Sequence, residues 1–260
     1  MTGVRRPRVD ACDPWFQRHL VDRPRLRLVC FAHAGGGAQS YFGWPAGLSD
    51  EVEVLSVQYP GRHNRLAESP LLAMTELADA ITVALKAYSG LPLVLFGHSM
   101  GSAVAYEVAT RLERDGGAHL RRLFVSGRGA PHRGYGSHRE LATDDASLIE
   151  SVRCLSGRDA ELYEHPEMRE FLLPPLRADY TLLDRYRPAR PPVRIAAPIT
   201  SYGGDRDPVC AVAELDSWAE VTESAHEVRI FPGDHFYLRG QEPALLAHLS
   251  QVLHTDGLLD

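Results

Sequence analysis

Residues 92–101 read PLVLFGHSMG, and this stretch decides the fold. Residues 92–96 form an apolar run typical of a buried parallel strand, and residues 102–114 have a helical pattern. Between them lies G-x-S-x-G, with Ser99 at its centre. Such a tight strand-to-helix turn needs glycine on either side, and it exposes the serine at a helix N-terminus, where a developing anion is favoured. Taken alone, the pattern also fits a glycine-rich loop. Its setting predicts Ser99 as a nucleophile.

The rest of the chain alternates apolar runs with helical patterns. This alternation predicts an α/β fold, with a mostly parallel central sheet flanked by helices. Residues 1–22 are predicted to be a weakly ordered lead-in in which Trp15 and Phe16 nevertheless pack against other residues. The predicted strands are residues 27–32, 52–57, 92–96, 120–126, 199–202 and 227–231. The predicted helices are residues 74–88, 102–114, 211–222 and 241–254.

Residues 128–190 differ in kind from the rest of the chain. They contain several helix-like stretches and no clear strand. We therefore predict a single domain over residues 1–260, with a helical insertion at 128–190. The helix-like stretches are residues 144–154, 160–163, 166–172 and 176–186.

A general base and an acid are expected after Ser99, in the chain order serine, acid, histidine. Asp207 follows the predicted strand 199–202, and His235 follows the strand 227–231. Both loops lie at carboxyl ends of strands, where open α/β sheets build their sites. Other histidines are less well placed: one beside the serine and expected to point away, one before the last strand and one in the closing helix (His98, His226, His254).

Two other aspartates lie near the predicted acid and base. Asp205 competes with Asp207, and the spacing from Gly204 favours Asp207. Asp205 is expected to form a turn by bonding its own backbone. Asp234 is too close in sequence to His235 to reach around its ring.

An oxyanion hole needs two backbone donors. The residue after the nucleophile, Met100, is predicted to supply one. The loop at residues 33–37, HAGGG, is predicted to supply the other through Ala34. A phosphate loop would end in Gly-Lys-Ser/Thr, and residues 38–40, AQS, do not. The resulting acyl transfer through Ser99 needs no metal or organic cofactor.

Composition excludes several classes of function. The chain has 260 residues, 44% of them hydrophobic, and a formal net charge of -6. This charge gives no support for nucleic-acid or membrane-surface binding. No apolar window spans about 20 residues, and the N-terminus lacks the apolar region of a signal peptide. Four widely spaced cysteines predict free, buried thiols in a reducing compartment, and we expect a soluble cytoplasmic protein.

Four segments together carry a resemblance to a known family. They are residues 30–37 (CFAHAGGG), 58–62 (QYPGR), 97–101 (GHSMG) and 232–236 (PGDHF). The set resembles the type II thioesterases, stand-alone editing enzymes of polyketide and non-ribosomal peptide synthesis with an α/β-hydrolase fold. The resemblance spans nearly the whole chain. Ala32 stands where many members have proline.

The resemblance implies a stand-alone serine thioesterase that removes stalled or aberrant acyl groups. Its substrates would be thioesters on the phosphopantetheine arms of acyl or peptidyl carrier proteins. It also implies that residues 128–190 form a lid over the acyl pocket. The implied catalytic residues are Ser99, Asp207 and His235, with Ala34 and Met100 as the oxyanion hole.

Two other functions remain open: a cytoplasmic carboxylester hydrolase on the same fold, and a non-catalytic relative that binds or scaffolds. We expect a monomer. An acidic carrier protein would need a local basic patch, although each arginine also fits a solvated surface. The candidate arginines are Arg5, Arg6, Arg8, Arg128, Arg133 and Arg139. Candidate acyl-pocket residues, which core packing explains equally well, are Met168, Phe171, Leu172 and Leu173.

Overall fold

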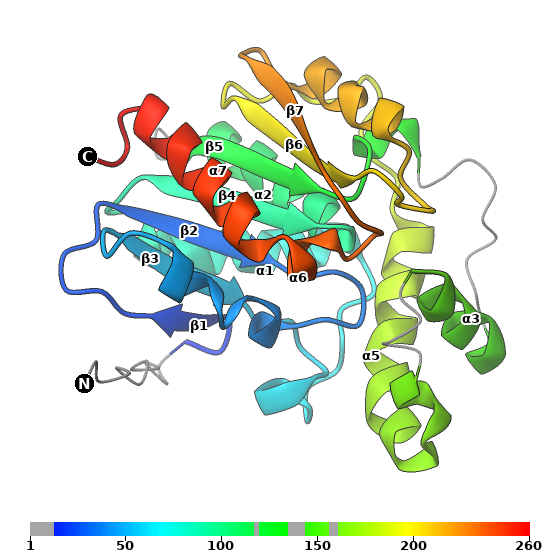
Figure 1. The fold of residues 1–260 in the computed structure, drawn as a ribbon. Coiled ribbons are helices and arrows are strands. Elements are labelled where there is room, and N and C mark those ends of the chain that lie inside the picture. The colour runs from blue at the N-terminus through cyan, green and yellow to red at the C-terminus, as the bar shows by residue number, and fades with distance from the viewer. Residues whose placement is uncertain (1–12, 117–119, 135–143, 156–160) are drawn as a thin grey trace, which may run out of the picture.

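The computed structural model describes residues 13–116, 120–134, 144–155 and 161–260 (Figure 1). Seven strands form one sheet in the order β1-β3-β2-β4-β5-β6-β7, and all neighbours are parallel except β1 and β3. The predicted mostly parallel sheet is therefore confirmed. The strands are β1 (Phe16–His19), β2 (Leu26–Phe31), β3 (Val52–Val57), β4 (Leu93–His98), β5 (Leu120–Ser126), β6 (Ile199–Gly204) and β7 (His226–Phe231).

The first strand corrects a sequence prediction. Phe16–His19 pairs antiparallel with β3, so part of the predicted lead-in is an ordered edge strand. Phe16 is 2% exposed and belongs to the main hydrophobic core. Residues 1–12 lie outside the described part of the chain.

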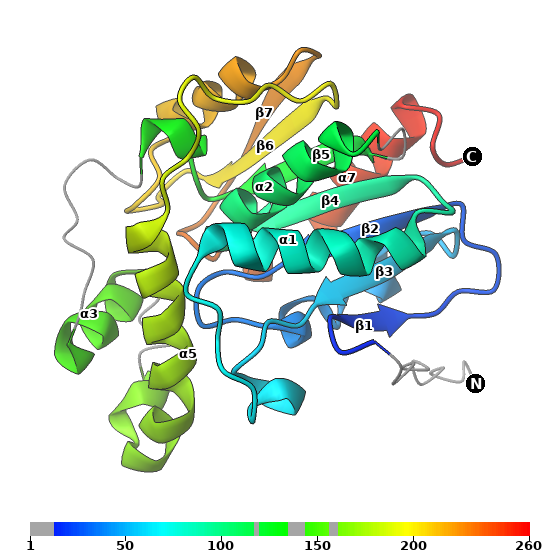
Figure 2. The same cartoon turned by 180° about the vertical axis from the view of Figure 1, so that it is seen from behind.

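The central strands are buried because helices cover both faces of the sheet. Every residue of β3, β4 and β6 is buried, as expected for strands of a parallel sheet that is covered on both faces. Helices α1 (Met74–Leu85) and α2 (Met100–Arg114) lie on one face, and α7 (Glu242–Thr255) lies on the other (Figures 1 and 2).

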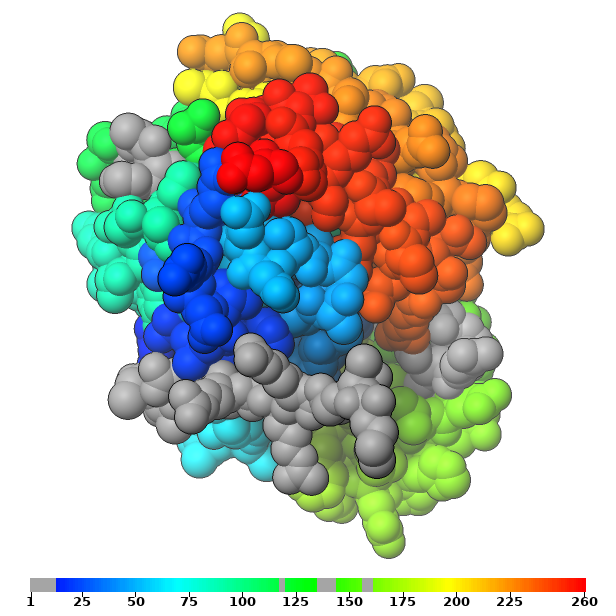
Figure 3. Space-filling view, turned by 60° about the vertical axis from the view of Figure 1, so that its left-hand side comes forward, coloured from blue at the N-terminus to red at the C-terminus, as the bar shows by residue number. Residues whose placement is uncertain are grey.

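Helix α7 makes a close contact with an early segment of the chain. It packs against the short 3-10 helix Trp44–Gly47. A Cβ on Gly47 would lie 2.7 Å from Leu246 Cδ1, so glycine permits this approach. Figure 3 shows the C-terminal segment, in red and orange, against this early segment in blue.

A helical segment follows β5 in the chain and precedes β6. It contains α3 (Asp145–Leu155), the 3-10 helix Glu161–Glu164 and α5 (Pro166–Arg185). In Figure 1, α3 and α5 stand beyond the carboxyl ends of the parallel strands. Among residues 128–134, 144–155 and 161–190 no strand occurs.

Helix α5 is longer than the sequence predicted. The two predicted stretches 166–172 and 176–186 form one helix that contains Pro174 and Pro175. Proline costs helix hydrogen bonds, but the half of α5 after these prolines buries its apolar side chains, which compensates. The predicted helix at 211–222 is instead a 3-10 helix, Val212–Val221.

Among the described residues, no helix is long and apolar enough to cross a membrane. Three cysteines within the described chain, Cys30, Cys154 and Cys210, are free thiols; Cys30 and Cys210 are buried as predicted, whereas Cys154 is exposed, so that prediction is wrong for it. Cys12 lies outside it.

Candidate active site

Ser99 occupies the turn between β4 and α2 in a strained backbone conformation. Its φ is 55° and its ψ is −116°, a combination that L-residues rarely adopt and that costs about 1–3 kcal/mol. The Ser99 N–H donates to Ser126 O over 2.7 Å, which ties the turn to β5. Such strain persists only where the surroundings enforce it, and it is typical of functional sites.

Two glycines make this turn sterically possible. A Cβ on Gly97 would lie 2.2 Å from Gly101 O, and a Cβ on Gly101 would lie 2.0 Å from Phe31 O. Both distances are far below van der Waals contact and both involve backbone atoms, so the neighbours cannot yield cheaply. The predicted reason for glycine around Ser99 therefore has a direct structural basis.

The structure brings Asp207 and His235 together at the carboxyl ends of β6 and β7. His235 Nδ1 donates to Asp207 Oδ2 over 2.8 Å, and the two side chains are 1% and 0% exposed. Gly204 allows the two loops to meet, since a Cβ there would lie 2.4 Å from Asp234 O. His235 Nε2 is buried and has no hydrogen-bond partner among the described residues. Its lone pair is therefore available for a proton.

The competing aspartates serve as structural acceptors. Asp205 Oδ1 accepts the Gly233 N–H over 2.8 Å, so it joins the two loops instead of bonding its own backbone as predicted. It is Asp207 that accepts local N–H groups, from Val209 at 2.9 Å and Cys210 at 3.2 Å. These bonds hold the Asp207 carboxylate in place.

His98 does not point away from the site, and that prediction is wrong. Its ring lies 5.0 Å from the His235 ring, centroid to centroid, and it lines the same cavity as Ser99. Its Nδ1 lies 2.9 Å from Ser126 Oγ, which in turn lies 2.6 Å from Tyr237 OH. Burial, followed by the nearby His235 and His33, lowers the pKa of His98 well below its usual value, so His98 is neutral near pH 7.

The predicted oxyanion donors border the same site. Ala34 lies in the loop after β2, and Met100 is the first residue of α2. Within the described chain, neither backbone N–H donates a hydrogen bond to another residue. A helix N-terminus leaves such groups unpaired, so the Met100 N–H is free to meet an oxyanion.

A pair of residues that the sequence analysis did not assign supports this loop. Arg62, from the segment 58–62, makes two hydrogen bonds to Asp179 of α5, at 2.6 and 2.7 Å. The same side chains contact the backbone at Gly35 and Gly36. The QYPGR segment signalled Arg62, but no local pattern marked Asp179 as its partner.

A cavity of about 320 Å³ contains Ser99 and His235. The helical segment closes it with apolar and aromatic side chains, which suit an acyl chain. Of the four predicted pocket residues, Leu172 lines the cavity, Leu173 is buried in the adjacent cluster, and Met168 and Phe171 are exposed on α5. Its lining from the helical segment comprises Val152, Leu155, Leu162, Tyr163, Leu172, Leu176 and Tyr180.

A second nucleophile near the site is held neutral. Cys210 is buried beside the Asp207 carboxylate, and burial followed by that negative charge raises the pKa of its thiol to about 12. A neutral thiol is a poor nucleophile. Ser99 therefore has no competitor in Cys210.

Comparison with known proteins identifies the family. The thioesterase domain pattern matches residues 26–253. The chain belongs to the thioesterase domain family. The family match, together with the fold, establishes a thioester hydrolase of the α/β-hydrolase fold.

Two curated relatives of this thioesterase are similar to it over most of their length. It is 38% identical to the thioesterase PikA5 of Streptomyces venezuelae over 87% of this chain and 81% of that protein. It is 32% identical to the gramicidin S biosynthesis protein GrsT of Aneurinibacillus migulanus, over 88% and 90%.

Solved thioesterases share the fold closely. The type II thioesterase BorB from the borrelidin cluster matches with a TM-score of 0.83 and 36% identity, over 92% of this chain and 97% of BorB. RedJ, from the prodiginine pathway of Streptomyces coelicolor, matches with a TM-score of 0.80 and 38% identity, over 95% and 91%.

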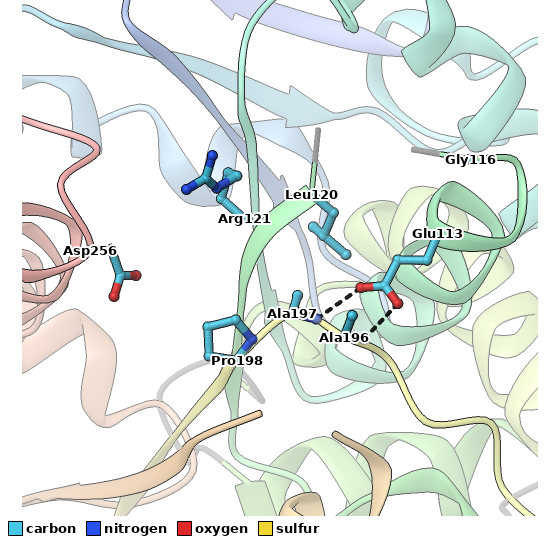
Figure 4. A pocket seen from close by; sticks show the side chains of 8 residues that line it. All are labelled: Glu113, Gly116, Leu120, Arg121, Ala196, Ala197, Pro198 and Asp256. Atoms are coloured by element: carbon cyan, nitrogen blue, oxygen red, sulfur yellow. Dashed lines mark hydrogen bonds between the residues drawn. The ribbon is translucent and has the colours of Figure 1, made fainter. Parts of the chain in front are cut away.

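A larger hollow of about 660 Å³ lies at the opposite end of the sheet of this thioesterase. Figure 4 shows Glu113 there, with its carboxylate directed at Ala196 and Ala197, just before β6. It accepts the N–H groups of Ala196 and Ala197 over 2.6 and 2.9 Å. Glu113 thus satisfies backbone donors, and the hollow is remote from Ser99.

The structure tests some of the predicted docking arginines. Arg128 is 4% exposed, so its prediction as a surface docking residue is wrong. Arg133 is exposed and pairs with Glu220. Arg5, Arg6, Arg8 and Arg139 lie outside the described residues.

Proposed function

We propose that this thioesterase hydrolyses acyl thioesters on the phosphopantetheine arms of carrier proteins in polyketide or non-ribosomal peptide synthesis. In this role it removes stalled or aberrant acyl groups. The observation that carries the proposal is the single cavity that joins Ser99, on its strained turn, to His235 paired with Asp207. The named relatives from antibiotic clusters support the biosynthetic setting.

In the proposed first half-reaction, His235 Nε2 takes the Ser99 hydroxyl proton as Oγ attacks the thioester carbonyl carbon. The carbonyl electron pair moves onto oxygen, where the N–H groups of Ala34 and Met100 stabilise it. When the pair returns, the C–S bond breaks and His235 gives its proton to the pantetheine sulfur. The products are the free thiol arm and an acyl-Ser99 ester.

Water completes the cycle by the same path. His235 deprotonates the water as its oxygen attacks the ester carbonyl, and the C–Oγ bond then breaks. The proton returns to Ser99 Oγ, and the carboxylic acid leaves. Asp207 stabilises the imidazolium of His235 in both halves and holds its ring in one orientation.

The lid function of residues 128–190 within one domain, 1–260, belongs to the same proposal. The apolar lining that α3 and α5 contribute supports a role in holding the acyl chain. We further propose a cytoplasmic monomer, and size-exclusion chromatography with light scattering checks the monomeric state in vitro.

The deciding experiment compares two substrates with the same acyl group. One is the acyl thioester of a phosphopantetheinylated carrier protein, and the other is the p-nitrophenyl ester. We expect a higher kcat/KM on the carrier thioester, and no activity on either substrate for the Ser99→Ala variant. Faster ester turnover, with no response to the carrier protein, would favour the carboxylester hydrolase instead.

A further inference from the structure

A buried ion pair connects helix α5 to the loop after β3. Arg62 Nη1 lies 2.6 Å from Asp179 Oδ2, and Arg62 Nη2 lies 2.7 Å from Asp179 Oδ1. The two side chains are only 4% and 5% exposed. Removing both charges from water is costly, so stability by itself is a weak reason for such a pair. The ion pair therefore points to a role beyond fixing α5 in place.

Both members of the pair also grip the loop at residues 33–37. Asp179 Oδ2 accepts the Gly35 N–H over 2.7 Å, and Arg62 Nη1 donates to Gly36 O over 2.9 Å. Charge-assisted bonds of this kind are short and strongly directional. They fix the peptide planes immediately after Ala34, whose N–H is the proposed oxyanion donor.

Helix α5 makes a second contact with the same loop, one turn before Asp179. A Cβ on Gly35, which has φ +78°, would lie 3.1 Å from Leu176 Cδ1. Leu176 belongs to a small apolar cluster of the helical segment, separate from the main core. Ala34 packs against both clusters, so the proposed oxyanion donor sits at the junction between α5 and the sheet.

We propose that Arg62 and Asp179 are positioning residues that hold the Ala34 N–H in its oxyanion-binding orientation. Because Asp179 lies on α5, the oxyanion hole is complete only while this helix is docked on the loop. The proposal rests on the proposed roles of Ser99 and Ala34. On this proposal the helical segment both positions a catalytic backbone group and encloses the acyl chain.

The test removes the pair without leaving a buried charge. The double variant Arg62→Met/Asp179→Leu replaces both charged groups by apolar ones, a change that buried pairs often tolerate. The matched control is Arg122→Met/Asp256→Leu. It removes another two-bond pair, Arg122 with Asp256 at 2.5 and 2.8 Å, near the opposite end of the sheet.

Three quantities are measured on each protein: kcat and KM for an acyl thioester, and the rate at which a fluorophosphonate labels Ser99. Far-ultraviolet circular dichroism checks the fold. Losing one oxyanion donor typically costs about 10²–10³-fold in turnover. We expect kcat and the labelling rate of the Arg62/Asp179 double variant to fall about 10²-fold, with KM within about threefold of wild type. The control should keep both rates.

A folded double variant with wild-type kcat and labelling would overturn the proposal, and so would an equal loss in the control. If the double variant does not fold, Asp179→Asn decides, because its amide cannot accept from both Gly35 and the full guanidinium fork. For the Asp179→Asn variant we then expect kcat to fall by a larger factor than KM changes. If hydrolysis survives in the Ser99→Ala variant, the proposed function is refuted. This result distinguishes failure of the proposed function from failure of the proposal for Arg62 and Asp179.

Discussion

His235 Nδ1 lies 2.8 Å from Asp207 Oδ2, in a site where the two side chains are 1% and 0% exposed. A buried carboxylate that accepts from Nδ1 places the ring proton there and leaves the lone pair on Nε2. The bond joins two loops that follow neighbouring strands, β6 and β7. This relationship distinguishes Asp207 from the adjacent acidic residues and leads to the first prediction.

Asp207→Asn should lower kcat by about 10⁴-fold, because an amide at this position favours the wrong histidine tautomer. Asp205→Asn is the matched control and should leave kcat nearly unchanged, since Asp205 is half exposed, accepts the Gly233 N–H in the neighbouring loop and lies near Arg206. Steady-state hydrolysis of an acyl thioester measures both. The opposite ranking of the two variants would show that Asp205 is the acid.

Replacing Ser99 should separate catalysis from backbone strain. Both Ser99→Ala and Ser99→Gly should lose on the order of 10⁶-fold in kcat, since each removes the nucleophile. The free energy of unfolding of Ser99→Gly should nevertheless be about 1 kcal/mol higher than that of Ser99→Ala, because glycine adopts φ 55° without strain. Urea denaturation measures the difference. Equal stability of the two variants would mean that relief of strain does not exceed the greater conformational entropy that glycine loses on folding.

Gly101→Ala should destabilise the protein by about 3 kcal/mol or more, because the added Cβ would lie 2.0 Å from Phe31 O. The control is Gly90→Ala, where an added Cβ meets no atom within 4 Å. That change should alter the free energy of unfolding by no more than about 0.5 kcal/mol. Thermal and urea unfolding compare the two, and similar losses would contradict the close approach of α2 to β2.

His98 should make stability depend on pH below about 6.5. Burial lowers its pKa in the folded protein, so the unfolded chain binds a proton that the native state does not. The free energy of unfolding should therefore fall as the pH drops below 6.5, by up to about 1.4 kcal/mol per pH unit from this residue. Above that pH its contribution does not change.

His98→Asn should show a shallower fall than wild type between pH 6.5 and 5. The pKa values of His226 and His248 are also lowered by burial, and they are present in both proteins, so the difference in slope isolates His98. Urea denaturation at a series of pH values measures it. Identical slopes would show that His98 takes up a proton in the folded state.

The predictable part of the fold follows from its buried strands. Continuous apolar runs such as residues 93–96 of β4 have a clear pattern because both faces of a parallel sheet are covered. The edge strand Phe16–His19 has no such pattern, since its other three residues are only partly buried. Pro174 and Pro175 favour a break between two helices, but the tertiary packing of α5 keeps one continuous helix.

The sequence by itself determined the turn around Ser99 and the order of its predicted partners. A tight turn is local, and its steric demand for glycine at positions 97 and 101 is visible in ten residues. Only the tertiary structure decided which side chains meet. It pairs Asp207 with His235, places His98 beside them, and joins Arg62 to Asp179 across 117 positions of sequence. These contacts depend on strand order and on the docking of α5, which no local pattern encodes.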